Sequence, residues 1–317
     1  MIGKRRPSEY GTVPPNGVGR ARTPYWPRIT IGYAVLCCVA ALVVSFTRPS
    51  FLLEMPAFVV LAVTLSVALC FSCAGQWYVH QRFAAHDFVQ HNEVGGFIIA
   101  VAGTLYAVVL GFLTVVAWQR FTDARQLVAE ESAAATDTWH AAIGLPFVNR
   151  SRVRDDILRY SKLMVSSEWP EMRRGGFDSQ ADIIVMDAIA AAGTLRPRDY
   201  MESNSQTATM QQLNVLHDIR LRRISANEGA ISPFEWVVLL VGAVCIIGFC
   251  WLFGLANRSI HLLMTATVTA IITSLLVLLF ELQYPFRSDL RILPQSWNGA
   301  IEHIHLMQSG SQTEMRM

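Results

Sequence analysis

The sequence predicts an all-α integral membrane protein, with two transmembrane hairpins, a central span and a helical soluble domain between spans three and four. Three observations support this fold class. The 317-residue chain is 52% hydrophobic and only 16% charged, whereas a soluble domain carries about a quarter charged residues. Five apolar stretches approach the roughly 20 residues that a helix needs to cross a bilayer. The polar region between the third and fourth stretches has apolar residues at helical spacing.

The five predicted spans lie near residues 29–46, 56–75, 95–118, 234–256 and 260–282. The first is the shortest, but a long polar leader precedes it and no small-x-small cleavage site follows. We therefore expect a retained span or anchor and not a signal peptide. Nine residues join spans one and two, and a short turn over Ala256 to Ser259 joins spans four and five. Each of these pairs is predicted to form an antiparallel hairpin.

The spans divide the chain into five parts. Residues 1–28 are rich in Pro, Gly and Arg, which is typical of a flexible basic tail. The remaining parts are spans one to three (29–118), the helical soluble domain (119–232), spans four and five (233–282) and a C-terminal tail (283–317).

The soluble domain is predicted to be helical throughout. Span three meets no helix breaker before Gly144 and Pro146, so its helix is expected to project beyond the membrane. A second helix is expected to stop at Pro170, and Asp178 or Ser179 can cap a third. A last polar helix is predicted over about 199–227.

Composition and motifs argue against several functions. The soluble domain carries 14 Lys and Arg against 15 Asp and Glu, so it offers no continuous basic face for nucleic acid. Zinc-ligand spacings, Walker loops and dinucleotide fingerprints are absent from the soluble parts, and the spans carry no intramembrane protease motif. Cys70 and Cys73 form a C-x-x-C inside an apolar span, where buried thiols are expected. We therefore expect no enzyme activity, no metal and no cofactor. Glu168 and the pair Glu130-Glu131 lie on polar helices, where a surface position is expected.

Span three begins with the polar triplet His91, Asn92 and Glu93. Asn92 is a favourable N-cap for a helix that begins at Glu93, and a carboxylate in the first turn suits the helix dipole. The functional alternative is that His91 and Glu93 form a proton- or ion-sensing pair at a pore mouth.

Inside span three, small residues recur at intervals of three and four and fall on one face of the helix. Such a stripe lets another helix approach closely, which stabilises helix packing in lipid. We predict a packing face, with a pore wall as the alternative. The stripe consists of Gly96, Ala100, Gly103, Ala107 and Gly111.

Span five carries a second pattern, in which His261, Thr265, Thr269 and Thr273 follow one another four residues apart. Threonine hydroxyls in membrane helices often donate to the carbonyl four residues earlier, which is a structural explanation. The functional alternative is a row that faces water or a pore, with His261 as a gating group at its mouth.

Several stretches resemble a bacterial family of bestrophin-like membrane proteins, over about residues 76–305. They are "HNEVGGFIIAVAGTLYAVVLGFLTVVAW", "LRYSKLMVSSEWPEM" and "YPFRSDLRILPQSW". The residues that match the family pattern are His91, Asn92, Glu93, Gly96, Tyr106, Trp118, Glu130, Glu168, Trp169, Pro285 and Phe286. The chain departs from the pattern in having two apolar segments before the His-Asn motif, and Arg287 and Ser288 where a glycine usually follows Pro-Phe.

The resemblance implies four spans, a helical cytosolic domain and an oligomeric anion channel. We therefore expect a homo-oligomer embedded in the lipid bilayer, and the bacterial inner membrane as its location. The alternative is a non-conducting scaffold or sensor that binds a protein partner through the soluble domain. Counted over five spans, the arginines and lysines divide evenly between the two sides; without the basic tail they favour a cytoplasmic soluble domain.

Overall fold

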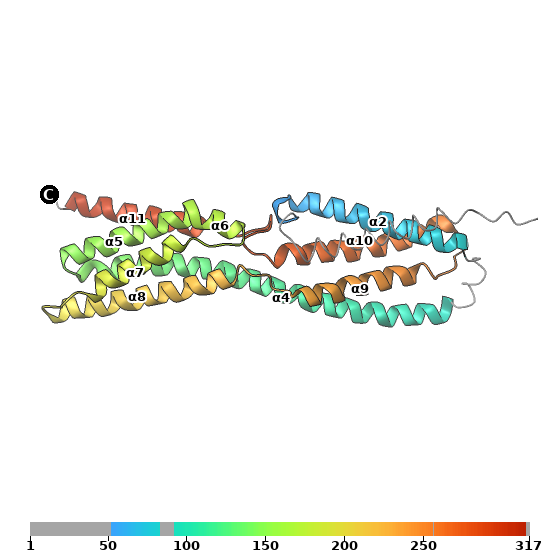
Figure 1. The fold of residues 1–317 in the computed structure, drawn as a ribbon, viewed down its shortest axis with the longest axis horizontal. Coiled ribbons are helices and arrows are strands. Elements are labelled where there is room, and N and C mark those ends of the chain that lie inside the picture. The colour runs from blue at the N-terminus through green and yellow to red at the C-terminus, as the bar shows by residue number, and fades with distance from the viewer. Residues whose placement is uncertain (1–51, 83–91, 256, 315–317) are drawn as a thin grey trace, which may run out of the picture.

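The computed structural model describes residues 52–82, 92–255 and 257–314, and every regular element in these ranges is a helix. The helices form an elongated bundle (Figure 1). We call the half built from residues 52–82, 92–118, 233–255 and 257–282 the membrane half, and the half built from residues 119–232 and 295–314 the soluble half. The basic tail 1–28, the predicted span at 29–46 and His91 lie outside the described residues.

Four helices in the described part of the chain are long and apolar enough to cross a membrane. They are α2 (Ala57–Arg82), the first half of α4 (Asn92–Ala141), α9 (Pro233–Cys250) and α10 (Arg258–Leu282). Helix α2 packs along α10, and α4 contacts both α9 and α10. Ser232 and Glu235 cap α9 reciprocally, and the Asn257 side chain caps α10. The protein is therefore a multi-pass, all-α membrane protein.

Helix α4 runs through both halves of the molecule (Figure 1). Its 50 residues correspond to about 75 Å at 1.5 Å per residue. It is followed by the short helix η2 (Ala142–Gly144), and Pro146 is the N-cap of the next helix, α5. The predicted extension of span three beyond the membrane is thus present as one continuous helix.

The soluble half surrounds the second half of α4. It contains α5 (Phe147–Leu163), α6 (Trp169–Arg173), α7 (Ser179–Gly193) and α8 (Tyr200–Ser225). Helix α8 packs along α4, and α5 packs against α7. The Asp178 side chain caps α7, and the Asp199 side chain caps α8, because each accepts a bond from a first-turn backbone N–H.

Two features of this half differ from the sequence-based predictions. The helix expected to stop at Pro170 continues to Arg173, through the π-helical turn η3 (Met164–Glu168). Pro170 is tolerated because it lies in the first turn of α6, where a backbone N–H has no helical partner. The C-terminal tail contains α11 (Gln295–Glu314), which packs on α4 and α5 and buries Trp297 completely.

Candidate functional site

The first half of α4 is the least covered of the apolar helices. Only 6% of its most apolar 18-residue window is buried, against 33% in α10. One side of the helix packs on its own chain, through residues such as Leu110 and Ala117. The opposite side is formed by exposed apolar residues, of which Leu105 and Phe112 are 65% and 68% exposed. The described residues of the chain therefore leave a long apolar face of α4 uncovered.

The predicted small-residue stripe lies beside this uncovered face. Ala100, Ala107 and Gly111 are exposed, and Gly96 and Gly103 are half-buried. A Cβ atom added at Gly96, Gly103 or Gly111 would meet no atom within 4 Å. No helix among the described residues of this chain packs closely on the stripe.

The threonine row of α10 is buried, which contradicts the water-facing alternative. The exposed fraction is between 0% and 8% for each member of the row: His261, Thr265, Thr269 and Thr273. The Thr269 hydroxyl lies 2.9 Å from the Ser72 hydroxyl on α2 and donates to the Thr265 carbonyl. The Thr265 hydroxyl donates to the His261 carbonyl, and the His261 ring contacts His80 of α2. These hydroxyls satisfy backbone and side-chain partners at a helix contact within one chain.

Two family-pattern residues attach α4 to the α9–α10 pair. The Asn92 amide donates to the Gly254 carbonyl at 2.7 Å and accepts from the Gly254 N–H at 3.0 Å. Asn92 therefore binds the loop after α9, whereas the sequence predicted a cap on its own helix. The Tyr106 hydroxyl donates to the Leu239 carbonyl at 3.1 Å, and its ring lies against Gly242.

Gly242 provides the space for that contact. A Cβ atom at Gly242 would lie 2.7 Å from the Tyr106 ring, so the close approach of α4 and α9 requires a glycine there. Two other predicted residues lie at the surface. Glu93 is exposed in the first turn of α4, and Trp118 is 59% exposed and stacks with Phe121.

A buried cluster of four charged side chains holds the soluble half together. Glu131 of α4, Glu168 of η3, and Arg220 and Arg223 of α8 are each 0% exposed. The Glu168 carboxylate accepts from Arg220 at 2.7 Å and from Arg223 at 3.0 Å. Arg223 also pairs with Glu131. The cluster is neutral as a whole, so its burial does not leave an uncompensated charge.

Neighbouring groups complete the hydrogen bonds of this cluster. Arg220 donates to Asp182 at 2.8 Å and to the Asp178 carbonyl at 2.9 Å, and Glu168 accepts from the Asp178 N–H at 2.7 Å. The Tyr160 hydroxyl donates to Glu131. The ring of Tyr160 packs edge-on against Trp297 of α11. The network therefore connects α4, α5, α7, α8 and α11.

The surroundings of the cluster shift the pKa values of Tyr160, Arg220 and Arg223. Burial and the adjacent Glu131 carboxylate raise the pKa of the Tyr160 hydroxyl well above its usual value, so it remains a donor. Burial disfavours the charge of Arg220 and Arg223. The acidic groups and hydrogen bonds around them outweigh burial, and the pKa of each guanidinium is raised. The cluster is thus suited to holding helices together and not to exchanging protons.

The sequence predicted a surface position for Glu130, Glu131 and Glu168. This prediction is wrong for two of these three acids. Glu168 and Glu131 are fully buried, whereas Glu130 is exposed and accepts a hydrogen bond from Gln126. The buried acid of α4 is therefore one residue beyond the position assigned from the family pattern. Arg220 and Arg223 were not predicted. A signal for them exists in the spacing of Leu213, Leu216, Arg220 and Arg223, which all lie on the buried face of α8.

The Trp169, Pro285 and Phe286 positions meet at the boundary between the two halves. Trp169 is 8% exposed, packs edge-on against Phe286, and donates from its indole N–H to the Ile292 carbonyl at 3.1 Å. Pro285 is buried, and its carbonyl accepts from the Ile292 N–H. Trp169 is therefore a buried anchor between the helix that ends at Arg173 and the segment after α10.

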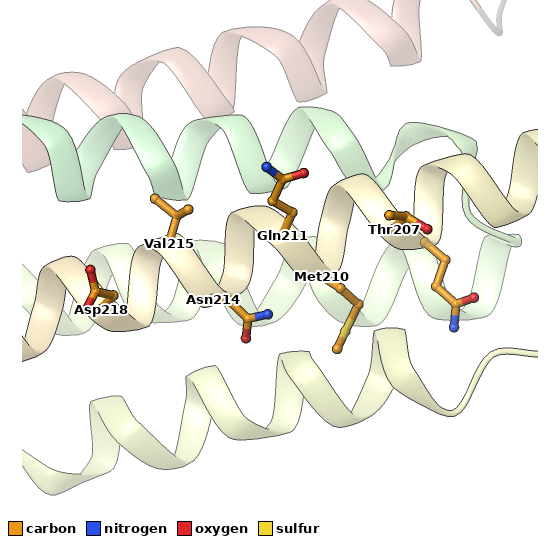
Figure 2. Close-up of a pocket in the computed structure, with 7 residues that line it drawn as sticks. Thr207, Met210, Gln211, Asn214, Val215 and Asp218 are labelled. Atoms are coloured by element: carbon orange, nitrogen blue, oxygen red, sulfur yellow. The ribbon is translucent and has the colours of Figure 1, made fainter.

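The outer face of α8 carries a shallow depression of about 620 Å³ (Figure 2). Its lining includes the polar residues Gln211, Asn214 and Asp218, with Met210 and Val215 as its apolar members. This lining differs from the hydrophobic groove that a scaffold function predicts. Within the described ranges, no three His, Cys, Asp or Glu side chains are placed to hold a metal ion.

Comparison with known proteins gives a family match and a fold match. The family model of the Bestrophin-like domain matches residues 66–297 of this sequence. Two variants of a bacterial bestrophin homologue from Klebsiella pneumoniae are similar in structure, with TM-scores of 0.54 and 0.55 at 16% and 15% sequence identity. The matches cover 78% and 76% of this chain and 99% of each homologue. No curated protein sequence matches the chain.

Proposed function

The chain belongs to the bestrophin-like family, and from this premise we propose that it is an oligomeric ion channel of the membrane. One observation carries the proposal. The longest apolar helix, α4, turns one side to its own chain, and the described residues leave the rest of its membrane half uncovered. In a bilayer such a face contacts either lipid or another helix, and the small residues beside it favour close packing by other copies of the same chain.

The helical periodicity of α4 supports two roles for its open faces, one lining the ion path and the other packing on a neighbouring copy. At 100° per residue, Leu105 and Phe112 lie opposite the side that packs on the chain itself, and would point toward a central axis. The exposed small residues Ala100, Ala107 and Gly111 lie between the side that packs on the chain itself and this open direction, and a neighbouring copy would pack on them.

The proposed conducting path is apolar along its membrane section. No residue between Glu93 and Arg120 is charged. An ion passing along α4 would therefore cross a hydrophobic constriction, a kind of barrier that gates by dewetting. Anions are the expected ion class on the basis of the family resemblance.

Ion flux through proteoliposomes that contain the purified full chain tests the proposal. We expect chloride flux from the wild-type protein. Leu105→Ala should increase that flux, because it widens the apolar constriction. Leu263→Ala on α10 is the matched control, since Leu263 is 67% exposed and lies on another helix; its flux should equal that of the wild type.

An assembled wild-type protein that passes no ion would end the channel proposal and favour a non-conducting scaffold. Equal increases of flux in the Leu105→Ala and Leu263→Ala variants would contradict the assignment of the path to α4. The scaffold alternative predicts a protein partner on the soluble half, and the polar lining of the α8 depression offers it little apolar area.

A further inference from the structure

A cavity rich in arginine lies at the boundary between the membrane half and the soluble half. Its volume is about 700 Å³. It is bordered by the segment just before α2, by η3 and α6, and by the segment just after α10, which meet at the middle of the molecule (Figure 1). The lining residues that matter here are Glu54, Trp169, Phe286 and the four arginines Arg173, Arg174, Arg287 and Arg291.

The position of the cavity along the chain places it at the membrane surface. Glu54 lies three residues before α2 begins at Ala57, and Phe286 lies four residues after α10 ends at Leu282. Both helices are apolar enough to cross a bilayer. Arg287 and Arg291, which follow the end of α10, are therefore at the level of the lipid headgroups.

The positive charge in the cavity is only partly compensated. Arg174 pairs with Glu171 at 2.7 Å, and Arg291 lies 3.9 Å from Asp289. The Asp289 carboxylate also accepts from the Ala57 N–H at the start of α2. Arg173 and Arg287 form no ion pair with any residue that the structure describes. Glu54 is the one carboxylate that lines the cavity.

Arg287 is held in place while one of its donors stays unused. Its guanidinium lies over the Tyr284 ring at 5.1 Å. Its Nε atom is buried, and no described group accepts a hydrogen bond from it. Gly175, at φ 88°, makes room for this side chain, because a Cβ atom there would lie 3.2 Å from Arg287 Cζ. A buried donor of this kind favours an anionic acceptor.

The same cavity has an apolar wall. Trp169 and Phe286 are 8% and 2% exposed and pack edge-on against each other, with Leu53 beside them. A free phosphate ion would use only the arginines. A phospholipid would use both parts, since its headgroup phosphate meets the guanidinium groups while its glycerol and upper acyl chain lie on the apolar wall.

From this combination we propose that the cavity binds the headgroup of an anionic phospholipid, through the guanidinium groups of Arg173, Arg287 and Arg291. This site is separate from the proposed ion path along α4 and does not depend on conduction. A bound lipid would connect the start of α2 and the end of α10 to the soluble half through α6.

Binding of a short-chain phosphatidylglycerol to the purified full chain in detergent tests the proposal, with native mass spectrometry or a thermal shift as the readout. An arginine near an anionic lipid surface contributes about a fivefold factor in affinity. Arg287→Gln combined with Arg291→Gln should therefore weaken binding by about 25-fold. Arg159→Gln on α5, whose side chain is 60% exposed, is the matched control and should bind as the wild type does.

A second variant tests the lipid site if the protein with both Arg287→Gln and Arg291→Gln folds poorly. Glu54→Gln removes the carboxylate of the lining and should tighten phosphatidylglycerol binding, a result that misfolding cannot produce. Short-chain phosphatidylcholine should bind far more weakly to the wild type. Unchanged affinity in both the double variant and Glu54→Gln would overturn the site. Full competition by an equal concentration of inorganic phosphate would overturn the lipid assignment in favour of a free phosphate.

Discussion

At the scale of single residues, the adjacent acids Glu130 and Glu131 provide a direct test of the buried cluster. Glu131→Gln leaves Arg223 with one fewer carboxylate partner in a fully buried site. Breaking a buried ion pair costs about 3–5 kcal/mol, and we expect that loss in the free energy of unfolding measured by chemical denaturation. Glu130→Gln removes an exposed charge and should change stability by less than about 0.5 kcal/mol. Equal losses in the two variants would contradict the assignment of Glu131 as the structural acid.

Thr269 offers a second test at this scale. Its hydroxyl is buried between α10 and α2, where it contacts Ser72. Thr269→Val keeps the shape of the side chain and removes that contact, which in membrane proteins is worth about 0.6 kcal/mol. We expect a small loss of thermal stability and unchanged ion flux. Altered ion selectivity in an assembled Thr269→Val protein would show that the row has a functional role despite its burial.

At the scale of helices, Ala107 and Ala102 separate the packing face of α4 from the rest of the helix. Both are exposed in the single chain, and they lie about 140° apart on the helix. Ala107→Leu should disrupt the oligomer, because a bulky side chain on the small-residue stripe keeps a neighbouring helix away. Ala102→Leu should leave assembly intact. Light scattering of the detergent-solubilised protein measures the mass of each variant, and equal masses would contradict the proposed face.

The helices themselves were largely predictable from the sequence, because each depends on local signals. Hydropathy indicated the four described spans, and the absence of a breaker before Gly144 indicated the extension of α4. Asp178 and Ser179 were the two predicted caps of α7, and the structure places the cap at Asp178. In contrast, α11 was missed because its apolar residues are few, and its stability depends on packing Trp297 against Tyr160.

The candidate sites were less predictable, because they depend on contacts between distant segments. Glu168 and Arg220 are 52 residues apart in the chain, and no local pattern indicates that they pair. The threonine row shows the opposite error. Its spacing was correct, but spacing alone does not say whether a helix face meets water or another helix. Ser72 of α2, almost 200 residues away, decides that question.

At the scale of the whole molecule, the orientation in the membrane can be measured at Tyr200. This residue begins α8 at the far end of the soluble half and is 91% exposed. We expect a cytoplasmic soluble half, because the charges of the chain without its basic tail favour that orientation. A cysteine at Tyr200, in a variant without the native cysteines, should react with an impermeant thiol reagent only after the cells are permeabilised. Labelling in intact cells would place the soluble half outside.

The continuity of α4 also has a mechanical consequence. An α-helix bends sharply where a proline, a π-bulge or a similar defect interrupts it, and α4 is assigned as regular α-helix over all of its 50 residues. The Glu131 cluster holds the soluble part of α4, and Asn92 binds the start of the helix to the loop after α9. Such a helix behaves as one rigid rod. A rotation of the soluble half about the helix axis would therefore rotate the membrane part of α4 by the same angle, together with every apolar side chain along it.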